Sequence, residues 1–389
     1  MHFELTEEQR MLSDTVYKWA LNELGPVQEK IDEEDWMPPN FFRDLGRLGV
    51  LGITVEERYG GLGMDVLTEV LVTEQLARIC PGPAMSMVAH VELCASNIQR
   101  NASDYLKEKY LPPLIRGEKV GAMGLTEPNA GSDAMALRCR AVRNGNSFIL
   151  NGSKMFITNG PIADIVLVYA KTAPDLGPKG ISAFIVEKGA PGFSVSSKIK
   201  KAGMRGSPTA ELNFDDCEVP AENLVGDLNG GVAVMTKGLD VERVVVAGLS
   251  LGISRQTLDY SIKYSREREQ FGVPICEFQM IQAKLAEMYA RYEASRNMIY
   301  RAACLAQGAG RGGKGTQITQ LAAAAILYAA EAATRNGSDA VQIHGGYGYC
   351  LEFPVQKLWR DAKLLEIGAG TTEIRKMIIA RELLRKGSI

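Results

Sequence analysis

The sequence predicts a mainly helical α+β protein with a small antiparallel β domain in its middle, and three observations predict it. Apolar residues recur at helical spacing before residue 120, strand-like runs separated by turn dipeptides follow, and helical patterns return from Gly231 onward. A chain of 389 residues is also long enough for two or three domains. We therefore expect a helical domain over residues 1–120, a β domain over 121–228 and a helical, four-helix-bundle domain over 229–389.

The first element is predicted to be a helix. Thr6 and Gln9 have the spacing of a capping box, and apolar residues follow at helical spacing until Gly25-Pro26 stops the pattern. Further helices are expected over 40–48, 66–78 and 104–115.

The middle of the chain changes to strand-like patterns. Strands are expected over 137–142, 147–150 and 154–157, and the dipeptides Asn144-Gly145 and Asn151-Gly152 between them are strong hairpin signals. The apolar runs 165–170 and 181–186, followed by 211–214, complete the predicted β domain near Gly226.

Long helices are predicted for the last part of the chain. Phe278, Ile281, Leu285 and Met288 begin a helical spacing that extends to Ile299. Helices of this length usually form a bundle and often the core of an oligomer.

Composition excludes several classes of function. The net charge of -2 and the pI of about 6.1 give no electrostatic footprint for nucleic acid or an anionic membrane, and no apolar run reaches membrane-spanning length. Three distant histidines and seven scattered cysteines predict no metal site and a reducing compartment. The acidic N-terminus differs from a signal peptide, so we expect a cytoplasmic protein, as in a bacterium, or a processed protein of the mitochondrial matrix.

Glu242 is the first candidate catalytic residue. It lies in a helix-like run, 238–248, whose other members are mostly apolar and are expected to face inward. Burial raises the pKa of a carboxyl group toward neutrality, so such a group can remove a weakly acidic proton. The alternative is a structural ion pair, with Asp240 and Arg243 as the nearby charges.

Four further motifs carry both a functional and a structural interpretation. The glycine-rich segment 308–315 approaches a phosphate-binding pattern, but it follows a helix and is interpreted as a loop between helices. The segment 125–133 offers hydroxyls and Gly131 for pyrophosphate or a planar ring, or is an ordinary turn. The segment 266–272 fits a solvated charge run, and 342–349 fits a turn with a structural His344.

Several segments together resemble the acyl-CoA dehydrogenase family, over nearly the whole chain and in the same order. They are Thr126-Glu127-Pro128 with Gly131-Ser132-Asp133, Met155 to Gly160, Arg268 to Gly272, Gln342 with Gly345-Gly346, and Arg360 to Lys363. The resemblance implies a homotetramer that binds one FAD per subunit without a Rossmann fold. It also implies an acyl-CoA substrate and an electron-transfer flavoprotein as electron acceptor.

The resemblance assigns cofactor-binding residues to both halves of the chain. Those expected at the subunit's own flavin are Met123, Leu125, Thr126, Gly131, Ser132, Phe156 and Thr158. Arg268, Gln270 and Phe271 are expected to reach a neighbouring subunit's FAD, in a site completed by Gln279, Gln342, Gly345, Gly346, Thr371 and Glu373.

The resemblance also bears on the catalytic base. Most members carry a glutamate before the Gly-Thr pair near the C-terminus, where this chain has Ala369. Isovaleryl-type members carry it instead in a Leu-Asp-Leu-Glu-Arg motif, which Leu239 to Arg243 resembles, so Glu242 replaces the missing acid. The resemblance implies a short or branched acyl-CoA substrate and substrate contacts from Ser132, Asp240, Arg243, Gly368, Ala369, Gly370 and Glu92.

The acyl chain itself stays open at this point. Leu365 stands where a tyrosine is expected, and Glu92 is interpreted as a solvated helix residue, as part of a pocket for a cyclic or polar acyl group, or as a second acid-base group. Two other classes remain: a flavin monooxygenase or oxidase on the same fold, which would consume oxygen rapidly, and a degenerate acyl-CoA-binding member, which would purify without flavin.

Overall fold

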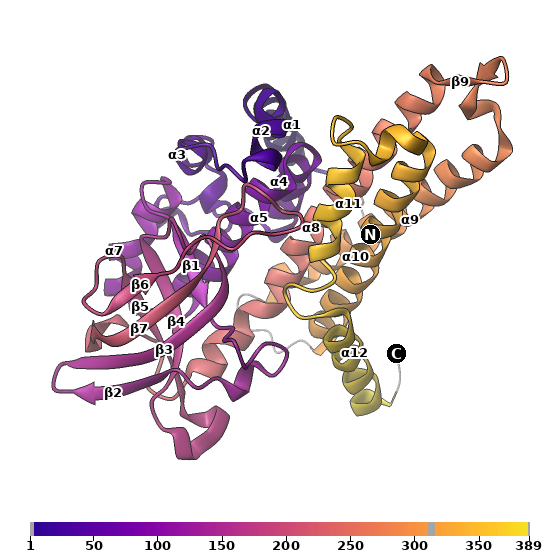
Figure 1. Cartoon of the computed structure of the whole chain (residues 1–389). Helices are drawn as coiled ribbons and strands as arrows, with labels where there is room; N and C mark the ends of the chain where they lie inside the picture. Colours follow the sequence, from indigo (N-terminus) through magenta and orange to yellow (C-terminus); the bar gives the residue numbers. More distant parts are fainter. Residues whose placement is uncertain (1–3, 310–315, 388–389) are drawn as a thin grey trace.

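The computed structural model describes residues 4–309 and 316–387 and confirms the mainly helical α+β fold with a sheet in the middle. In Figure 1 the N-terminal helices lie beside the strands, and the long C-terminal helices extend away from both. The expected boundaries at 120/121 and 228/229 remain predictions.

The N-terminal part of the chain is helical throughout. The capping box is confirmed, because the Gln9 amide donates to Thr6 Oγ1 over 3.2 Å and the Thr6 amide donates to Gln9 Oε1 over 3.1 Å. The helices are α1 (Glu7–Glu23), α2 (Gln28–Glu33), α3 (Phe41–Arg47), α4 (Val66–Ile79), α5 (Pro81–Val88), the π-helical η4 (Ala89–Ala95), α6 (Ser96–Asn101) and α7 (Asp104–Ile115).

Within the described residues the middle part forms an eight-stranded sheet of order β6-β7-β3-β2-β4-β5-β8, with β1 paired to β4. Most pairs are antiparallel, as expected, but β1 and β2 each pair with β4 in parallel. The strands are β1 (Gly121–Gly124), β2 (Arg140–Asn144), β3 (Ser147–Thr158), β4 (Ile165–Lys171), β5 (Ile181–Glu187), β6 (Phe193–Val195), β7 (Thr209–Pro220) and β8 (Leu224–Val225).

The two Asn-Gly dipeptides have different structures. Asn144-Gly145 turns between β2 and β3 as predicted, with Asn144 paired to Ser147. The second predicted hairpin is wrong, because β3 continues through Asn151-Gly152 with a bulge in its pairing to β7. Gly152 has φ 143°, and the Asn151 side chain bonds Asp216 on the neighbouring strand through both its oxygen and its nitrogen.

The C-terminal part consists of long helices: α8 (Gly231–Glu267), α9 (Gln279–Ala309), α10 (Thr316–His344), α11 (Val355–Leu364) and α12 (Thr372–Lys386). A two-stranded hairpin, β9 (Glu269–Gln270) with β10 (Val273–Pro274), joins α8 to α9 at the far end of the molecule (Figure 1). Of the glycine-rich segment 308–315, residues 310–315 lie outside the described residues.

Helix α8 packs closely against α4 because it presents small residues there. A Cβ atom on Gly252 would lie 2.4 Å from the Glu74 carbonyl oxygen, and one on Gly248 would lie 3.1 Å from that of Val70. Only glycine permits the Gly252 contact. This contact holds α8, the helix that carries Glu242, against the N-terminal helices.

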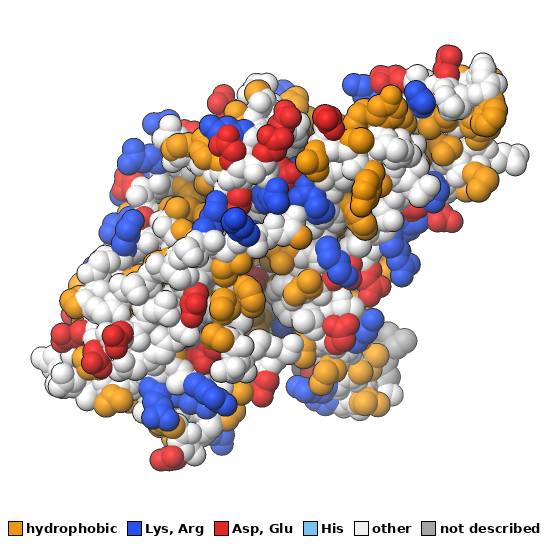
Figure 2. All heavy atoms as spheres, viewed as in Figure 1, with side chains coloured by type: hydrophobic (Ala, Val, Ile, Leu, Met, Phe, Trp, Pro, Cys, Tyr) orange, Lys and Arg blue, Asp and Glu red, His pale blue; other side chains and the backbone are white. Residues whose placement is uncertain are grey.

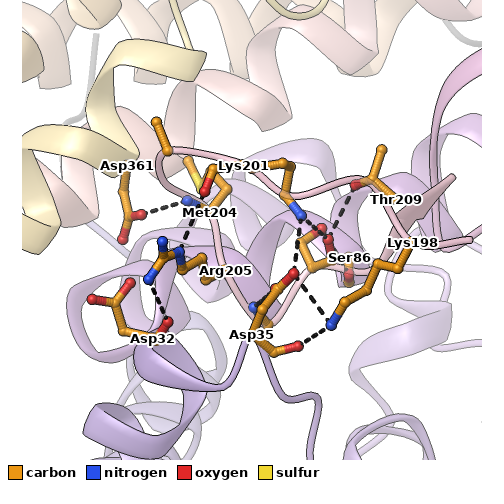
Figure 3. A network of polar contacts seen from close by, with 12 residues as sticks. Asp32, Asp35, Ser86, Lys198, Lys201, Met204, Arg205, Thr209 and Asp361 are labelled. Atoms are coloured by element: carbon orange, nitrogen blue, oxygen red, sulfur yellow. Dashed lines mark hydrogen bonds and ion pairs between the residues drawn. The ribbon is translucent and has the colours of Figure 1, made fainter.

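A polar network connects the loop before β7 to the helices on either side (Figure 3). Asp35 accepts from the Gly206 amide over 2.6 Å and pairs with Lys198 over 3.2 Å. On the other side, Asp361 of α11 accepts from the Met204 amide over 2.5 Å. These bonds fix the sheet to helices at both ends of the chain.

The described ranges, with their gaps at both termini and at 310–315, contain no helix that is long and apolar enough to cross a membrane. In the same ranges no three His, Cys, Asp or Glu side chains gather in a way that could hold a metal ion. The seven cysteines are all described, and none of them forms a disulfide.

Candidate active site

Glu242 lies in the first half of α8 and is buried, with 6% of its surface exposed. Its carboxyl group accepts no hydrogen bond from any described residue, so the salt bridge that would make it purely structural is not formed. Burial raises the pKa of Glu242 to about 7, while Arg243 opposes the increase and Glu92 adds to it. This pKa is close to the optimum for a general base at neutral pH.

The predicted ion pair beside Glu242 forms between its neighbours. Arg243 donates to Asp240 Oδ1 over 2.8 Å, and Thr319 of α10 donates to Asp240 Oδ2 over 2.5 Å. The pair therefore connects α8 to α10 and leaves the Glu242 carboxyl group without an ion-pair partner. The buried Nε of Arg243 also has no partner in the described part of the chain.

The turn before α12 contacts the same region. Ala369 has φ 53° and Gly370 has φ 86°, both left-handed, and Thr371 caps α12 by accepting from the Ile374 amide over 3.3 Å. Arg375 of α12 is fully buried and donates to the Gly368 carbonyl oxygen over 2.6 Å. Because Arg375 also lowers the pKa of Glu242, it places the 368–370 turn in the electrostatic environment of the proposed base.

The segment after β1 is held by a buried ion pair. Lys154, which is fully buried, lies 2.7 Å from Glu127 and also donates to the Leu125 carbonyl oxygen over 3.2 Å. The Met155 amide donates to the Thr126 carbonyl oxygen over 2.8 Å. These contacts bring the predicted cofactor residues 125–126 beside the strand that carries Phe156 and Thr158.

These residues fit a planar, phosphate-bearing cofactor. Phe156 has φ 61° and is 65% exposed, so a large apolar ring faces solvent from a strained backbone beside Thr126. Gly131 and Ser132 are exposed, and the position of a Cβ on Gly131 is open to at least 4 Å. An exposed aromatic ring and an open glycine turn are suited to a flavin ring and its pyrophosphate.

The predicted cofactor residues from Arg268 to Gly346 gather at the opposite end of the molecule, whereas Thr371 and Glu373 lie at the N-terminus of α12. The Arg268 guanidinium lies 5.6 Å from the centre of the Tyr347 ring, so the α8–β9 junction contacts the turn that follows Gln342. Figure 2 shows apolar side chains at this tip, where Phe271 is 94% exposed. Gln270 and Gln279 are exposed there, as are Gln342, Gly345 and Gly346. In Figure 1 the β9–β10 hairpin, whose turn contains Phe271, lies at the far end of the molecule from β3, the strand that carries Phe156.

Glu92 is not a solvated helix residue, so that interpretation of the sequence is wrong. It is 1% exposed and lies in the π-helical segment η4, which turns it toward Ser96 and Arg100. Ser96 Oγ donates to Glu92 Oε1 over 2.9 Å, and Arg100 Nη2 lies 3.4 Å from Glu92 Oε2. Segments of π-helix often mark functional sites.

Sequence reasoning missed four residues of this site. Glu69 of α4, Arg100 of α6, Tyr169 of β4 and Arg375 of α12 are buried or nearly buried and interact electrostatically with Glu242 or Glu92. Burial and the charge of Glu242 together raise the pKa of Tyr169. A charged residue with apolar neighbours, such as Glu69 before Val70 and Leu71, was the available signal.

Three family profiles match the chain in order. They are the acyl-CoA dehydrogenase N-terminal domain over residues 6–118, the middle domain over 122–217 and the C-terminal domain over 229–384. Together with the fold, these matches define an FAD-dependent oxidoreductase that acts on acyl-CoA.

Relatives of similar length support the same family assignment. The chain is 47% identical to isovaleryl-CoA dehydrogenase, mitochondrial, of Pongo abelii, over 97% of this chain and 89% of the relative. It is 42% identical to butyryl-CoA dehydrogenase of Megasphaera elsdenii, with a TM-score of 0.95 over 99% and 100% of the two chains. A chain from the structure described as the electron transferring flavoprotein of Acidaminococcus fermentans gives 42% identity and a TM-score of 0.96, over 99% and 100%. The protein belongs to the acyl-CoA dehydrogenase family.

Proposed function

We propose that this protein dehydrogenates a short or branched acyl-CoA to the trans-2-enoyl-CoA, with Glu242 as the base that removes the α-proton. The observation that carries the proposal is a buried carboxyl group with a pKa near 7 and no hydrogen-bond partner among the described residues. A buried carboxylate that has no such partner is free to accept a proton from a bound substrate.

The absence of an acid at the usual C-terminal position supports this role. Ala369 occupies that position, in a left-handed turn that Arg375 holds close to the environment of Glu242. A methyl side chain there is smaller than the glutamate side chain that it replaces. In this proposal the 368–370 turn, Ser132 and the Asp240–Arg243 pair contact the acyl-CoA, and the substrate's Cα faces Glu242.

FAD is the cofactor of the proposal. When bound, FAD would supply at flavin N5 the acceptor for the hydride that leaves the substrate's β-carbon. The flavin and its pyrophosphate would be held by Met123, Leu125, Thr126, Gly131, Ser132, Phe156 and Thr158. Thr371 and Glu373, at the N-terminus of α12, would complete the site, because a helix N-terminus favours negative charge.

A second copy of the chain is also part of the proposal. Arg268, Gln270 and Phe271 lie at the β9–β10 hairpin, which Figure 1 shows at the far end of the molecule from β3, the strand that carries Phe156, and Phe271 is 94% exposed. They would reach the FAD of a neighbouring subunit in a homotetramer. An electron-transfer flavoprotein would accept the electrons. The cellular location we propose is the cytoplasm of a bacterium, or the mitochondrial matrix for a processed form.

Glu242→Gln tests the proposal, because the amide keeps the shape of the side chain and cannot take a proton. The variant is expected to bind FAD and to reduce it with isovaleryl-CoA at least about 10³-fold more slowly than the native protein, measured anaerobically as loss of flavin absorbance. Glu74→Gln, a buried glutamate of α4 that Tyr292 and Tyr300 hydrogen-bond, is the matched control.

The acyl chain is assigned by the same measurement with a panel of thioesters: isovaleryl, butyryl, isobutyryl, glutaryl and cyclohexanecarboxyl. Isovaleryl-CoA is expected to reduce the flavin fastest. Reduction at the native rate in Glu242→Gln would remove this residue from the role of base. Rapid oxygen consumption by the reduced protein would favour an oxidase instead.

A further inference from the structure

A cluster of buried polar residues lies beside the proposed base. It comprises Glu69 of α4, Glu92 of η4, and Ser96, Asn97 and Arg100 of α6, and is called the carboxyl cluster below. Two of its members pack against α8 one helical turn before Glu242. A Cβ on Gly238 would lie 3.1 Å from both Arg100 Nη1 and Asn97 Oδ1. Because residues four apart share a face of a helix, the cluster adjoins the face that carries Glu242.

The hydrogen bonds of the cluster identify which carboxyl group is ionised. Glu92 accepts from Ser96 and lies within ion-pair distance of Arg100, so a donor or a cation faces each of its oxygens. Glu69 is 1% exposed, and neither of its oxygens has a hydrogen-bond partner among the described residues. Burial and the charge of Glu92 hold the pKa of Glu69 well above its usual range. A hydroxyl donor and a cation therefore face Glu92, while no donor in the described part of the chain faces Glu69, so the geometry favours the negative charge of the pair on Glu92.

We infer that Glu92 is a positioning residue for the reaction: its fixed negative charge, held by Ser96 and Arg100, keeps Glu242 a strong enough base to take the α-proton. This inference rests on the proposed function. Like charges in a buried site disfavour one another, so a neighbouring carboxylate makes proton uptake by Glu242 more favourable. Glu92 acts through Glu242 and need not touch the substrate.

Other charged groups also face Glu242, and the inference depends on their balance. Arg243 lies on the same helix, Arg100 on α6 and Arg375 on α12, and all three lower the pKa of Glu242. Tyr169 faces it from β4 and is neutral at physiological pH, because burial raises its pKa. Glu92 is the carboxylate that opposes the three arginines. Burial is the largest of the causes that raise the pKa of Glu242, and the charge of Glu92 adds to it.

The test is the pH profile of anaerobic flavin reduction by isovaleryl-CoA in the FAD-loaded protein. The rate falls below the pKa of Glu242, because the base must be unprotonated. Glu92→Gln is expected to move this low-pH limb to lower pH by about one unit, since the like charge is removed. It also lowers the plateau several-fold, because a weaker base removes the α-proton more slowly. Glu92→Asp, which restores the charge, is expected to return the limb most of the way.

Two further variants separate charge from structure. Glu69→Gln replaces a neutral acid by a neutral amide, so the limb should stay within about 0.3 unit of its native position. Ser96→Ala removes one donor from Glu92 with little change in volume, and should shift the limb in the direction of Glu92→Gln by a smaller amount. It also serves as the test if Glu92→Gln does not fold.

The outcomes distinguish this inference from the proposed function. Suppose that the native protein shows a low-pH limb near neutrality and that this limb stays in place in both Glu92→Gln and Ser96→Ala. That result overturns the role of Glu92 and leaves Glu242 as the base. A native profile that keeps the same limb after Glu242→Gln overturns the proposed base itself. An equal shift in Glu69→Gln and Glu92→Gln would contradict the assignment of the neutral acid.

Discussion

Two buried polar regions of this protein differ in how completely their atoms are paired. In the network of Figure 3, the charged side chains Asp32, Asp35, Arg205 and Asp361 all have partners, and none of them contributes a buried unpartnered atom within the described residues. Around Glu242, by contrast, several buried polar atoms are unpaired within the described residues. Glu69, Arg100 and Arg375 are among the residues there with buried atoms that lack a described partner.

The difference separates a structural role from a catalytic one. Pairing every buried charge stabilises a fold, whereas a buried polar atom left unpaired costs about 1–3 kcal/mol. Such a cost persists where another group, such as a ligand or water, meets the atom in the working state. We therefore expect substitutions in the Figure 3 network to reduce stability and substitutions around Glu242 to change reactivity.

The largest expected effect on stability is that of Asp361→Asn. Lys357, which is 5% exposed, pairs with Asp361 over 2.6 Å and would be left as an uncompensated buried cation. The free energy of unfolding, measured by urea denaturation, should fall by about 3–5 kcal/mol. The rate of flavin reduction per bound flavin should stay within about twofold of the native rate, because Asp361 lies outside the site.

Asp44→Asn is the control for that variant. Its partner Arg47 is 79% exposed, so the loss should be below about 1 kcal/mol. Equal losses in the two variants would contradict the distinction between the regions.

Glu242→Gln should have an intermediate effect on the free energy of unfolding. Unlike Asp361→Asn, it should stabilise the protein. Because burial raises the pKa of Glu242 from 4.5 to about 7, the folded state holds this proton more tightly than the unfolded state. The stability that the protein gains from this bound proton is complete below pH 4.5. It is lost as pH rises toward 7, and the loss is at most about 3 kcal/mol. The variant lacks this loss, so it should unfold at a higher urea concentration than native protein at pH 8 and at a similar one at pH 4.5.

The smallest expected effect is that of Arg375→Met. Burial lowers the pKa of Arg375 to about 10, and two of its nitrogen atoms have no partner in the described ranges. Replacing this cation by an apolar chain should change the free energy of unfolding by less than about 1 kcal/mol. The low-pH limb of flavin reduction should move up by a few tenths of a unit. A downward shift would show that Arg375 does not act on Glu242 through its charge.

The sequence predicted much of the fold where local signals decide the structure. The capping box of Thr6 and the helix over 104–115 were predicted from a few neighbouring residues, and both are found. Asn151-Gly152 was misjudged because a cross-strand bond to Asp216, 65 residues away, decides its conformation. The dipeptide alone carries no signal of that contact.

The candidate site was predicted less completely, because its residues come from distant segments. The burial of Glu242 follows from its apolar neighbours in α8, and the structure agrees. The surroundings that set its pKa include Glu92, Arg100 and Arg375, which lie on three other elements. No periodicity connects those elements, so neither the carboxyl cluster nor the role of Arg375 could be read from spacing. The cofactor and substrate residues remain predictions.

Exchange of the α-hydrogens of a bound thioester in deuterated water tests the proposed base most directly. The suitable ligand is 3,3-dimethylbutyryl-CoA, which has α-hydrogens but no β-hydrogen, so proton removal occurs without hydride transfer. We predict that the native protein exchanges these hydrogens, as measured by mass spectrometry, and that Glu242→Gln does so at least about 10³-fold more slowly. Exchange at the native rate in that variant would show that another group removes the proton.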